Sequence, residues 1–260
     1  AIAERARLRL GLAPVRDVWG TLEAAGLHIV PLRLGAESEL DAVLVRTGEA
    51  DVCAGVNVDR WVFRQVFSAV HEYAHAVLDA DVTAEACSME PRRWRALAHE
   101  RRLREMRANQ FAAVFLAPRE ALVEHFQAAG AMRGGRIVRL TPVDLVRAMG
   151  HFGMSAEALL WRLQNADLIT ARQREEACSF RVGEVARALG IDFDAWRRPT
   201  VGRAEVIALE GYRRGRLSLG RLAEVFGLPK EEVYDLLRSW QVAQEPAVDE
   251  PEAGAAGHGT

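Results

Sequence analysis

Lysine is nearly absent from this chain of 260 residues, and the charges nearly balance. Lys230 is the only lysine among 34 basic residues, so arginine supplies almost every positive charge. We interpret this bias as the codon usage of a GC-rich genome. The net charge is −2, and without the four acids of residues 243–260 the rest of the chain stands near +2. Neither value requires a nucleic-acid or membrane partner.

Cysteine is scarce, and long apolar runs are missing. The three cysteines, Cys53, Cys87 and Cys178, fit neither a disulfide framework nor the paired spacing of a zinc ribbon. The first residues lack the apolar core of a signal peptide, and no apolar run is long enough to cross a bilayer. We therefore expect a cytoplasmic protein in a reducing compartment, with no membrane partner.

Residues 71–75 carry the motif H-E-x-x-H as His-Glu-Tyr-Ala-His. Positions i and i+4 of a helix share one face, so His71 and His75 can bind one metal ion while Glu72 handles the proton of a bound water. The alternative is two histidines on a solvated helix face. Apolar residues that recur at helical spacing around the motif argue against it: Phe63, Val66, Phe67, Val70, Ala74, Val77 and Leu78.

A catalytic zinc site needs a third protein ligand, which must come from downstream. Glu105 is favoured because Asn109 lies four residues later, on the same helix face, where a polar side chain can fix the second nitrogen of a metal-bound histidine. Spacing alone leaves open that Glu105 is a surface acid paired with Arg101 or Arg102. The full set of candidates is Asp79, Asp81, Glu85, Glu90, His99, Glu100 and Glu105.

The two motifs in this order resemble the ImmA/IrrE family of metallopeptidases. The matching residues are His71, Glu72 and His75, followed by Glu105, Ala108, Asn109, Phe111, Ala112, Ala113 and Pro118. The resemblance covers roughly residues 1–170. It implies that His71, His75 and Glu105 bind the metal and that Glu72 is the general base. It also implies a regulatory endopeptidase that depends on Zn²⁺, with Mn²⁺ as the alternative metal, and a helix-turn-helix repressor or similar regulator as its substrate.

The pattern along the chain predicts an α+β fold. We expect a mostly helical, zincin-like domain with a small β-sheet against the motif helix over residues 1–170. A small helical, helix-turn-helix-like domain follows over 178–242, and a disordered acidic tail over 243–260. The predicted elements are a helix over 2–26, strands over 27–32, 42–46 and 52–58, a motif helix over 59–78 capped by Asp59, a loop over 79–90, helices over 91–116 and 119–129, a flexible loop over 130–135, and a junction over 168–180.

The C-terminal domain raises a second function. Phe226-Gly227 repeats Phe152-Gly153, and both pairs resemble the turn of a helix-turn-helix. Seven arginines between positions 197 and 221 are suited to phosphate contacts. Three acids on the second helix would repel DNA, however, so we favour docking to a partner protein over DNA binding; they are Glu231, Glu232 and Asp235.

Two further functions therefore stay open beside the regulatory peptidase. One is a DNA- or repressor-binding module whose metal site is structural or idle. The other is a toxin–antitoxin component that combines both activities. The sequence does not choose the group that stabilises the oxyanion; the candidates are Tyr73, His99, His125 and His151.

Overall fold

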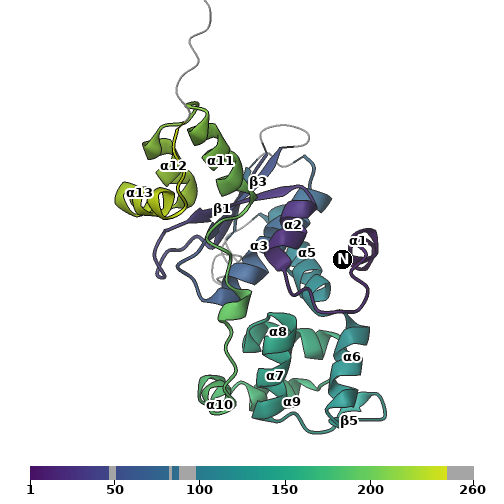
Figure 1. The fold of residues 1–260 in the computed structure, drawn as a ribbon. Coiled ribbons are helices and arrows are strands. Elements are labelled where there is room, and N and C mark those ends of the chain that lie inside the picture. The colour runs from purple at the N-terminus through teal and green to yellow at the C-terminus, as the bar shows by residue number, and fades with distance from the viewer. Residues whose placement is uncertain (47–50, 82–83, 88–97, 245–260) are drawn as a thin grey trace, which may run out of the picture. The chain divides into compact units, whose positions relative to one another are not determined.

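The structure, a computed structural model, describes residues 1–46, 51–81, 84–87 and 98–244 (Figure 1). Contacts divide the chain into two compact units, residues 1–202 and residues from 203 onward, and each is described by itself. The predicted α+β class is confirmed, because the chain is mostly helical with small sheets. The predicted domain limits stay a prediction; the compact units divide after Gly202. None of the helices in the described ranges combines the length and apolar character that crossing a bilayer requires.

The first unit contains a mixed four-stranded sheet in the order β1-β3-β2-β4. β1 and β3 are parallel, and the other two pairings are antiparallel. Alternate residues of β1 are buried, as expected for a sheet with one face against a core. The three predicted strands are confirmed, with the last ending one residue early. The strands are β1 (Leu27–Leu32), β2 (Ala42–Arg46), β3 (Val52–Asn57) and β4 (Ala84–Cys87).

The fourth strand lies where a loop was predicted, so the loop over 79–90 is wrong at residues 84–87. The strand is short, and its sequence of Ala, Glu, Ala and Cys has little intrinsic preference for a strand. Its pairing with β2 explains its presence, for example Val43 opposite Ala86.

The single predicted helix over 2–26 is wrong. The chain forms α1 (Ile2–Arg7) and α2 (Val18–Ala24). Between them, Arg9 and Gly11 adopt a positive φ of 55°, which a continuous helix cannot contain. A new helix then begins after Asp17, whose side chain accepts a hydrogen bond from the backbone N–H of Gly20 at 2.9 Å.

The motif helix is α3 (Val62–Leu78), which packs against β1, β2, β3 and α2 (Figure 1). It begins three residues later than predicted, and its N-cap residue is Trp61 instead of Asp59. The carboxylate of Asp59 accepts a hydrogen bond from the backbone N–H of Gly35 at 2.7 Å. A contact with a distant loop has therefore replaced the expected helix cap.

The helix that carries Glu105 is α5 (His99–Leu116), which lies against α3. Its predicted start at Pro91 lies outside the described residues. Its predicted end at Leu116 is confirmed.

Further helices complete the first unit. Two predictions are wrong in part here: the loop over 130–135 contains the first strand of a hairpin, and the junction over 168–180 contains a helix that starts with a capping box formed by Thr170 and Gln173. The elements are α6 (Arg119–Ala128), β5 (Met132–Arg133), β6 (Arg136–Ile137), α7 (Pro142–Phe152), α8 (Ala156–Asn165), α9 (Ala171–Ala177), α10 (Val182–Ala188) and the 3-10 turn η1 (Asp194–Trp196).

Over its described residues, 203–244, the second unit contains α11 (Arg203–Arg213), α12 (Leu219–Phe226) and α13 (Lys230–Ser239). Gly227 ends α12 in the left-handed region, with a φ of 59°, just as Gly153 ends α7 with a φ of 67°. The repeated Phe-Gly pair thus marks the same local turn in both places. The predicted disordered tail falls mainly on residues 245–260, which lie outside the described residues.

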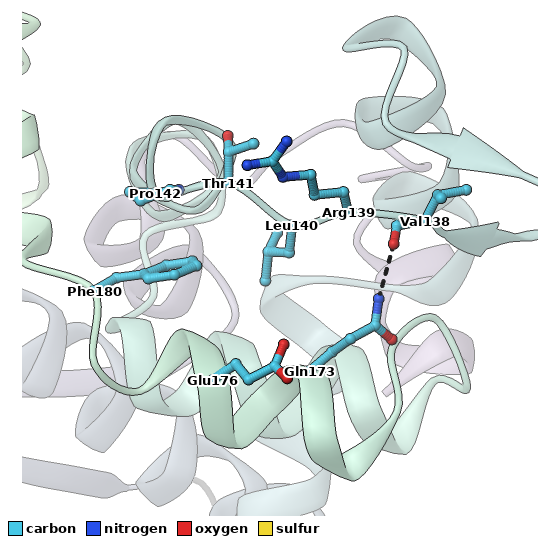
Figure 2. Close-up of a pocket in the computed structure, with 8 residues that line it drawn as sticks. All are labelled: Val138, Arg139, Leu140, Thr141, Pro142, Gln173, Glu176 and Phe180. Carbon is cyan, nitrogen blue, oxygen red and sulfur yellow. Dashed lines mark hydrogen bonds between the residues drawn. The ribbon is translucent and has the colours of Figure 1, made fainter.

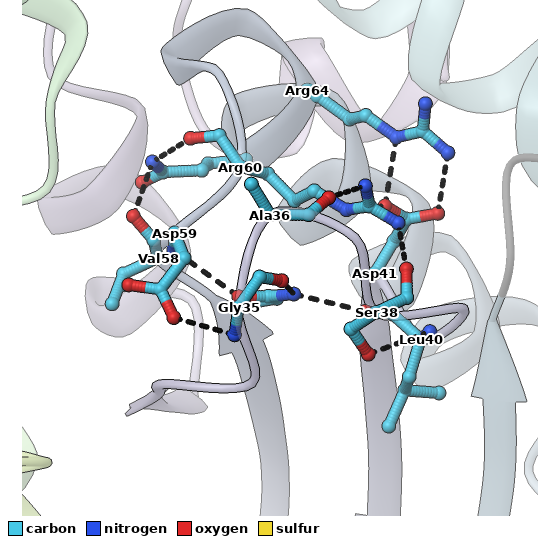
Figure 3. Close-up of polar contacts among 11 residues, drawn as sticks. Gly35, Ala36, Ser38, Leu40, Asp41, Val58, Asp59, Arg60 and Arg64 are labelled. Atoms are coloured by element: carbon cyan, nitrogen blue, oxygen red, sulfur yellow. Dashed lines mark hydrogen bonds and ion pairs between the residues drawn. The ribbon is translucent and has the colours of Figure 1, made fainter.

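A buried polar network ties the β1–β2 loop to the start of α3 (Figure 3). Asp41 is 1% exposed and receives both nitrogens of the Arg64 fork at 2.7 and 2.8 Å. Nε of Arg60 lies 2.9 Å from the same carboxylate, and the Arg60 guanidinium also donates to the carbonyls of Ala36 and Ser38. The network thus fixes the beginning of the motif helix against the loop.

Asp41→Ala is expected to lower the free energy of unfolding by about 3 kcal/mol, because two arginines would lose a buried counterion. Chemical denaturation followed by circular dichroism measures the change. Asp81→Ala is the control, since the exposed pair of Asp81 with Arg104 contributes less than about 1 kcal/mol. Equal losses in the two variants would contradict the role given to the network.

Candidate metal centre

Three buried side chains from α3 and α5 converge on one point. Nε2 of His71 lies 3.0 Å from Nε2 of His75. The Glu105 carboxylate lies 3.1 Å from Nε2 of His71 and 3.8 Å from Nε2 of His75. One donor atom from each residue lies within 4.8 Å of the other two. The structure therefore brings together the three residues that the sequence predicted as metal ligands.

Local sequence explains this convergence. The four-residue spacing places His71 and His75 on the face of α3 that meets α5. On α5, Ala108 and Ala112 are buried, and such small side chains allow the two helix backbones to approach closely. Glu105 is 2% exposed, so the alternative of a surface acid is wrong.

The outer nitrogens of both imidazoles have oxygen partners. Nδ1 of His71 lies 2.9 Å from Oδ1 of Asn109, and Nδ1 of His75 lies 2.8 Å from Oδ2 of Asp79. A carboxylate or amide oxygen accepts, so each Nδ1 carries the proton and each Nε2 presents a lone pair. The position predicted for Asn109 is thus the one it occupies.

The donor set fits a divalent metal ion. Two imidazole lone pairs and a carboxylate face one point, and they repel one another unless a cation lies between them. Neither oxygen of Glu105 accepts a hydrogen bond from the described residues, although both are buried. Buried carboxylates normally have such partners. A cation bound by His71, His75 and Glu105 would satisfy all three groups at once.

The electrostatics favour the forms that bind metals. Burial lowers the pKa of His75, and the neighbouring His71 lowers it further, against the opposing effect of Asp79 and Glu105. Burial raises the pKa of Glu105, whereas the adjacent imidazoles of His71 and His75, when protonated, and the charge of Arg101 lower it, and the net shift is below the ordinary value. A neutral imidazole and an ionised carboxylate are the forms that coordinate a cation.

The remaining candidates for a third ligand lie elsewhere or have other partners. Asp81 and Glu100 are exposed and pair with Arg104. His99 is exposed at the start of α5, while the side chains of Glu85 and Glu90 lie outside the described residues. Asp79 contacts the outer nitrogen of His75 and not the convergence point. In the sequence, Asp79 is a candidate ligand only, although its spacing of four residues from His75 also fits a hydrogen-bond partner.

Glu72 and Tyr73 of the motif have different surroundings. Glu72 is fully buried, as are the two histidines that flank it. The hydroxyl of Tyr73 contacts the carboxylate of Glu4 and accepts a hydrogen bond from Arg7 at 3.0 Å. Tyr73 thereby joins the motif helix to α1, so its hydroxyl is engaged by Glu4 and Arg7 and not by an oxyanion.

Two other oxyanion candidates, His125 on α6 and His151 on α7, contact each other. Their ring centroids are 4.6 Å apart. Burial and the proximity of His151 lower the pKa of His125 to about 4, against a smaller opposing effect of Asp144. Burial and the charge of Arg16 lower the pKa of His151.

The first unit has two cavities that are lined by neither His71, His75 nor Glu105. One, of about 310 Å³, lies between α9 and the segment before α7, and Figure 2 shows Gln173 reaching the carbonyl of Val138 across its wall. The other, of about 510 Å³, lies beside Trp61 at the start of α3. Neither cavity contributes to the candidate metal centre.

Comparison with known protein families identifies the family of this chain. The Peptidase M78 family, described as an IrrE N-terminal-like domain, matches residues 23–164, which is more than half of the chain. The chain belongs to the Peptidase M78 family. The M78 match includes His71, His75 and Glu105 and confirms the resemblance to ImmA/IrrE proteins. No curated protein matches the chain, and no solved structure does.

The pair of His125 and His151 should make the free energy of unfolding depend on pH. The folded-state pKa of His125, about 4, is below the ordinary value of 6.5, so the unfolded chain binds more protons between these values. The free energy of unfolding should therefore fall as the pH drops from about 6.5 to about 4. We expect His125→Gln to remove about 1 kcal/mol of this loss, a value reduced for partial exposure to water.

Denaturation curves at pH 7 and pH 4.5 measure this effect, and His99→Gln, which changes an exposed histidine, is the control. If the free energy of unfolding of His125→Gln falls between pH 7 and pH 4.5 as much as that of the wild type, the lowered pKa of His125 is contradicted.

Proposed function

We propose that this protein is a zinc-dependent endopeptidase with a regulatory role. The observation that carries the proposal is the convergence of two imidazoles and a buried carboxylate beside the buried Glu72 of an H-E-x-x-H motif. Membership of the Peptidase M78 family supports a peptide bond as the target.

His71, His75 and Glu105 would hold the metal ion. Two nitrogens and one oxygen from the protein form a donor set that catalytic zinc uses. Mn²⁺ is the alternative metal. When bound, the ion supplies Lewis acidity, which polarises the scissile carbonyl and makes a water molecule more acidic.

Glu72 is the general base. Its carboxylate takes the proton of the attacking water and then donates it to the leaving amine, so that one group serves both steps. A structural metal site has no need of a buried acid in this position. The presence of Glu72 therefore favours a peptidase over a module with an idle metal site.

The substrate we propose is a helix-turn-helix repressor or a similar regulator. This part of the proposal rests on the resemblance to ImmA/IrrE proteins, whose relatives act on such regulators. A cytoplasmic location fits that substrate and the scarcity of cysteine.

DNA binding is the alternative function, and the charges of the second unit weigh against it. Arg213 and Arg214 both pair with Glu210, and Arg221 pairs with Glu224 at 2.6 Å. Pairing within the unit leaves these arginines less available for phosphate groups. Docking of the substrate or another protein is the use that we favour for this unit, and a toxin–antitoxin component would use it in the same way.

Glu72→Gln is expected to bind zinc as the wild type does and to lose at least about 100-fold in cleavage, because the general base is removed while the three donors stay. Zinc content and cleavage of a co-expressed helix-turn-helix repressor are the two measurements. Glu100→Gln, which changes an exposed acid on α5, is the matched control. Cleavage retained by Glu72→Gln would refute its role as the base.

Removal of the metal should abolish cleavage, and added Zn²⁺ should restore it. The assay compares purified protein before and after treatment with a chelator, and after dialysis against Zn²⁺ or Mn²⁺. Cleavage that persists in the chelator-treated protein would contradict metal-dependent catalysis.

A further inference from the structure

A second connection between α3 and α5 lies beside the three converging residues. Asp79, which follows the last residue of α3, is 3% exposed. One oxygen of its carboxylate accepts a hydrogen bond from Nδ1 of His75 at 2.8 Å, and the other forms an ion pair with Arg107 of α5. The chain of contacts therefore runs from His75 through Asp79 to the neighbouring helix.

We propose that Asp79 and Arg107 form a positioning pair that sets the affinity of the metal centre. The inference rests on the proposed function, since it concerns the same metal. Asp79 holds the His75 ring so that Nε2 faces Glu105 and His71. Arg107 holds Asp79 in the place from which it can do so.

The two histidines differ in this respect. His71 has the neutral amide of Asn109 at its outer nitrogen, whereas His75 has a carboxylate. A carboxylate partner makes an imidazole a stronger electron-pair donor than a neutral partner does, and it also fixes which nitrogen carries the proton. His75 is therefore the ligand whose strength and orientation depend most on its outer partner.

The backbone and the arginine both restrain Asp79. Its backbone N–H donates to the carbonyl of His75 at 3.0 Å, so the end of α3 places the carboxylate beside the ring. The Arg107 side chain is 51% exposed and lies two residues after Glu105 in the chain. The ion pair thus joins the end of the helix that carries both histidines to the helix that carries the carboxylate ligand.

Arg107→Ala separates positioning from simple charge effects, because the two predict opposite signs. Removing a positive charge near a bound cation should strengthen zinc binding by Coulomb's law. If Arg107 positions Asp79, its removal should instead weaken zinc binding about 10-fold, within the range measured for the outer partners of metal ligands. Asp79→Ala should weaken it about 10- to 100-fold.

The experiment measures the dissociation constant of Zn²⁺ for the metal-free full chain by competition with a chromophoric chelator. Arg104→Ala is the matched control, since Arg104 lies on the same helix and pairs with the exposed Asp81 and Glu100. It should bind zinc as tightly as the wild type or slightly more tightly. The double variant Asp79→Ala/Arg107→Ala should bind zinc no more weakly than Asp79→Ala, because Arg107 acts through Asp79.

Circular dichroism of the metal-free variants checks folding, and the absorption spectrum of the Co²⁺-loaded forms reports the ligand geometry. If Asp79→Ala does not fold, Arg107→Ala alone tests the proposal. We expect this variant to fold, because the native Arg107 side chain is half exposed. Zinc binding by Arg107→Ala that equals or exceeds that of the wild type would overturn the positioning pair. A wild-type chain that binds no zinc would instead overturn the proposed function, together with this inference.

Discussion

The contact between α3 and α5 is the constraint on which the candidate site depends. Tyr73 packs against Phe111 while Asp79 pairs with Arg107, so later residues at α3 meet earlier residues of α5 and the two helices run in opposite directions. Burying the polar side chains of His71, His75, Glu105 and Asn109 at this contact would cost free energy if they had no partners. Each outer nitrogen has its oxygen, and the three inner groups face one another. A shift of either helix by one turn would separate the carboxylate from the imidazoles.

The rest of the first unit holds these helices in place. The sheet supports α3 from one side, and the Asp41 network fixes the start of that helix. At the C-terminal end of α5, the carbonyl of Phe115 accepts a hydrogen bond from Arg5 of α1, which is 2% exposed. Tyr73, one position after Glu72, contacts α1 as well. Segments far apart in the chain thus restrain the two helices that carry the proposed ligands.

The sequence predicted the elements whose cause is local. Short strand-like runs marked β1 to β3, and the four-residue spacings His71–His75 and Glu105–Asn109 marked the two faces that meet. Two of the misses have distant causes. Asp59 bonds to Gly35, 24 positions earlier, and so does not cap α3. β4 exists because β2 offers it an edge. The contact of Asp79 with His75 has a local cause instead, and the spacing of four residues could have indicated it.

The central claim is that one divalent cation is held by two imidazoles and one carboxylate. X-ray absorption at the zinc edge of the zinc-loaded chain tests it most directly. The account predicts one zinc per chain, with two imidazole nitrogens and carboxylate and solvent oxygens at about 2.0 Å and no sulfur ligand. Scattering from sulfur at about 2.3 Å, or from fewer than two imidazoles, would contradict it.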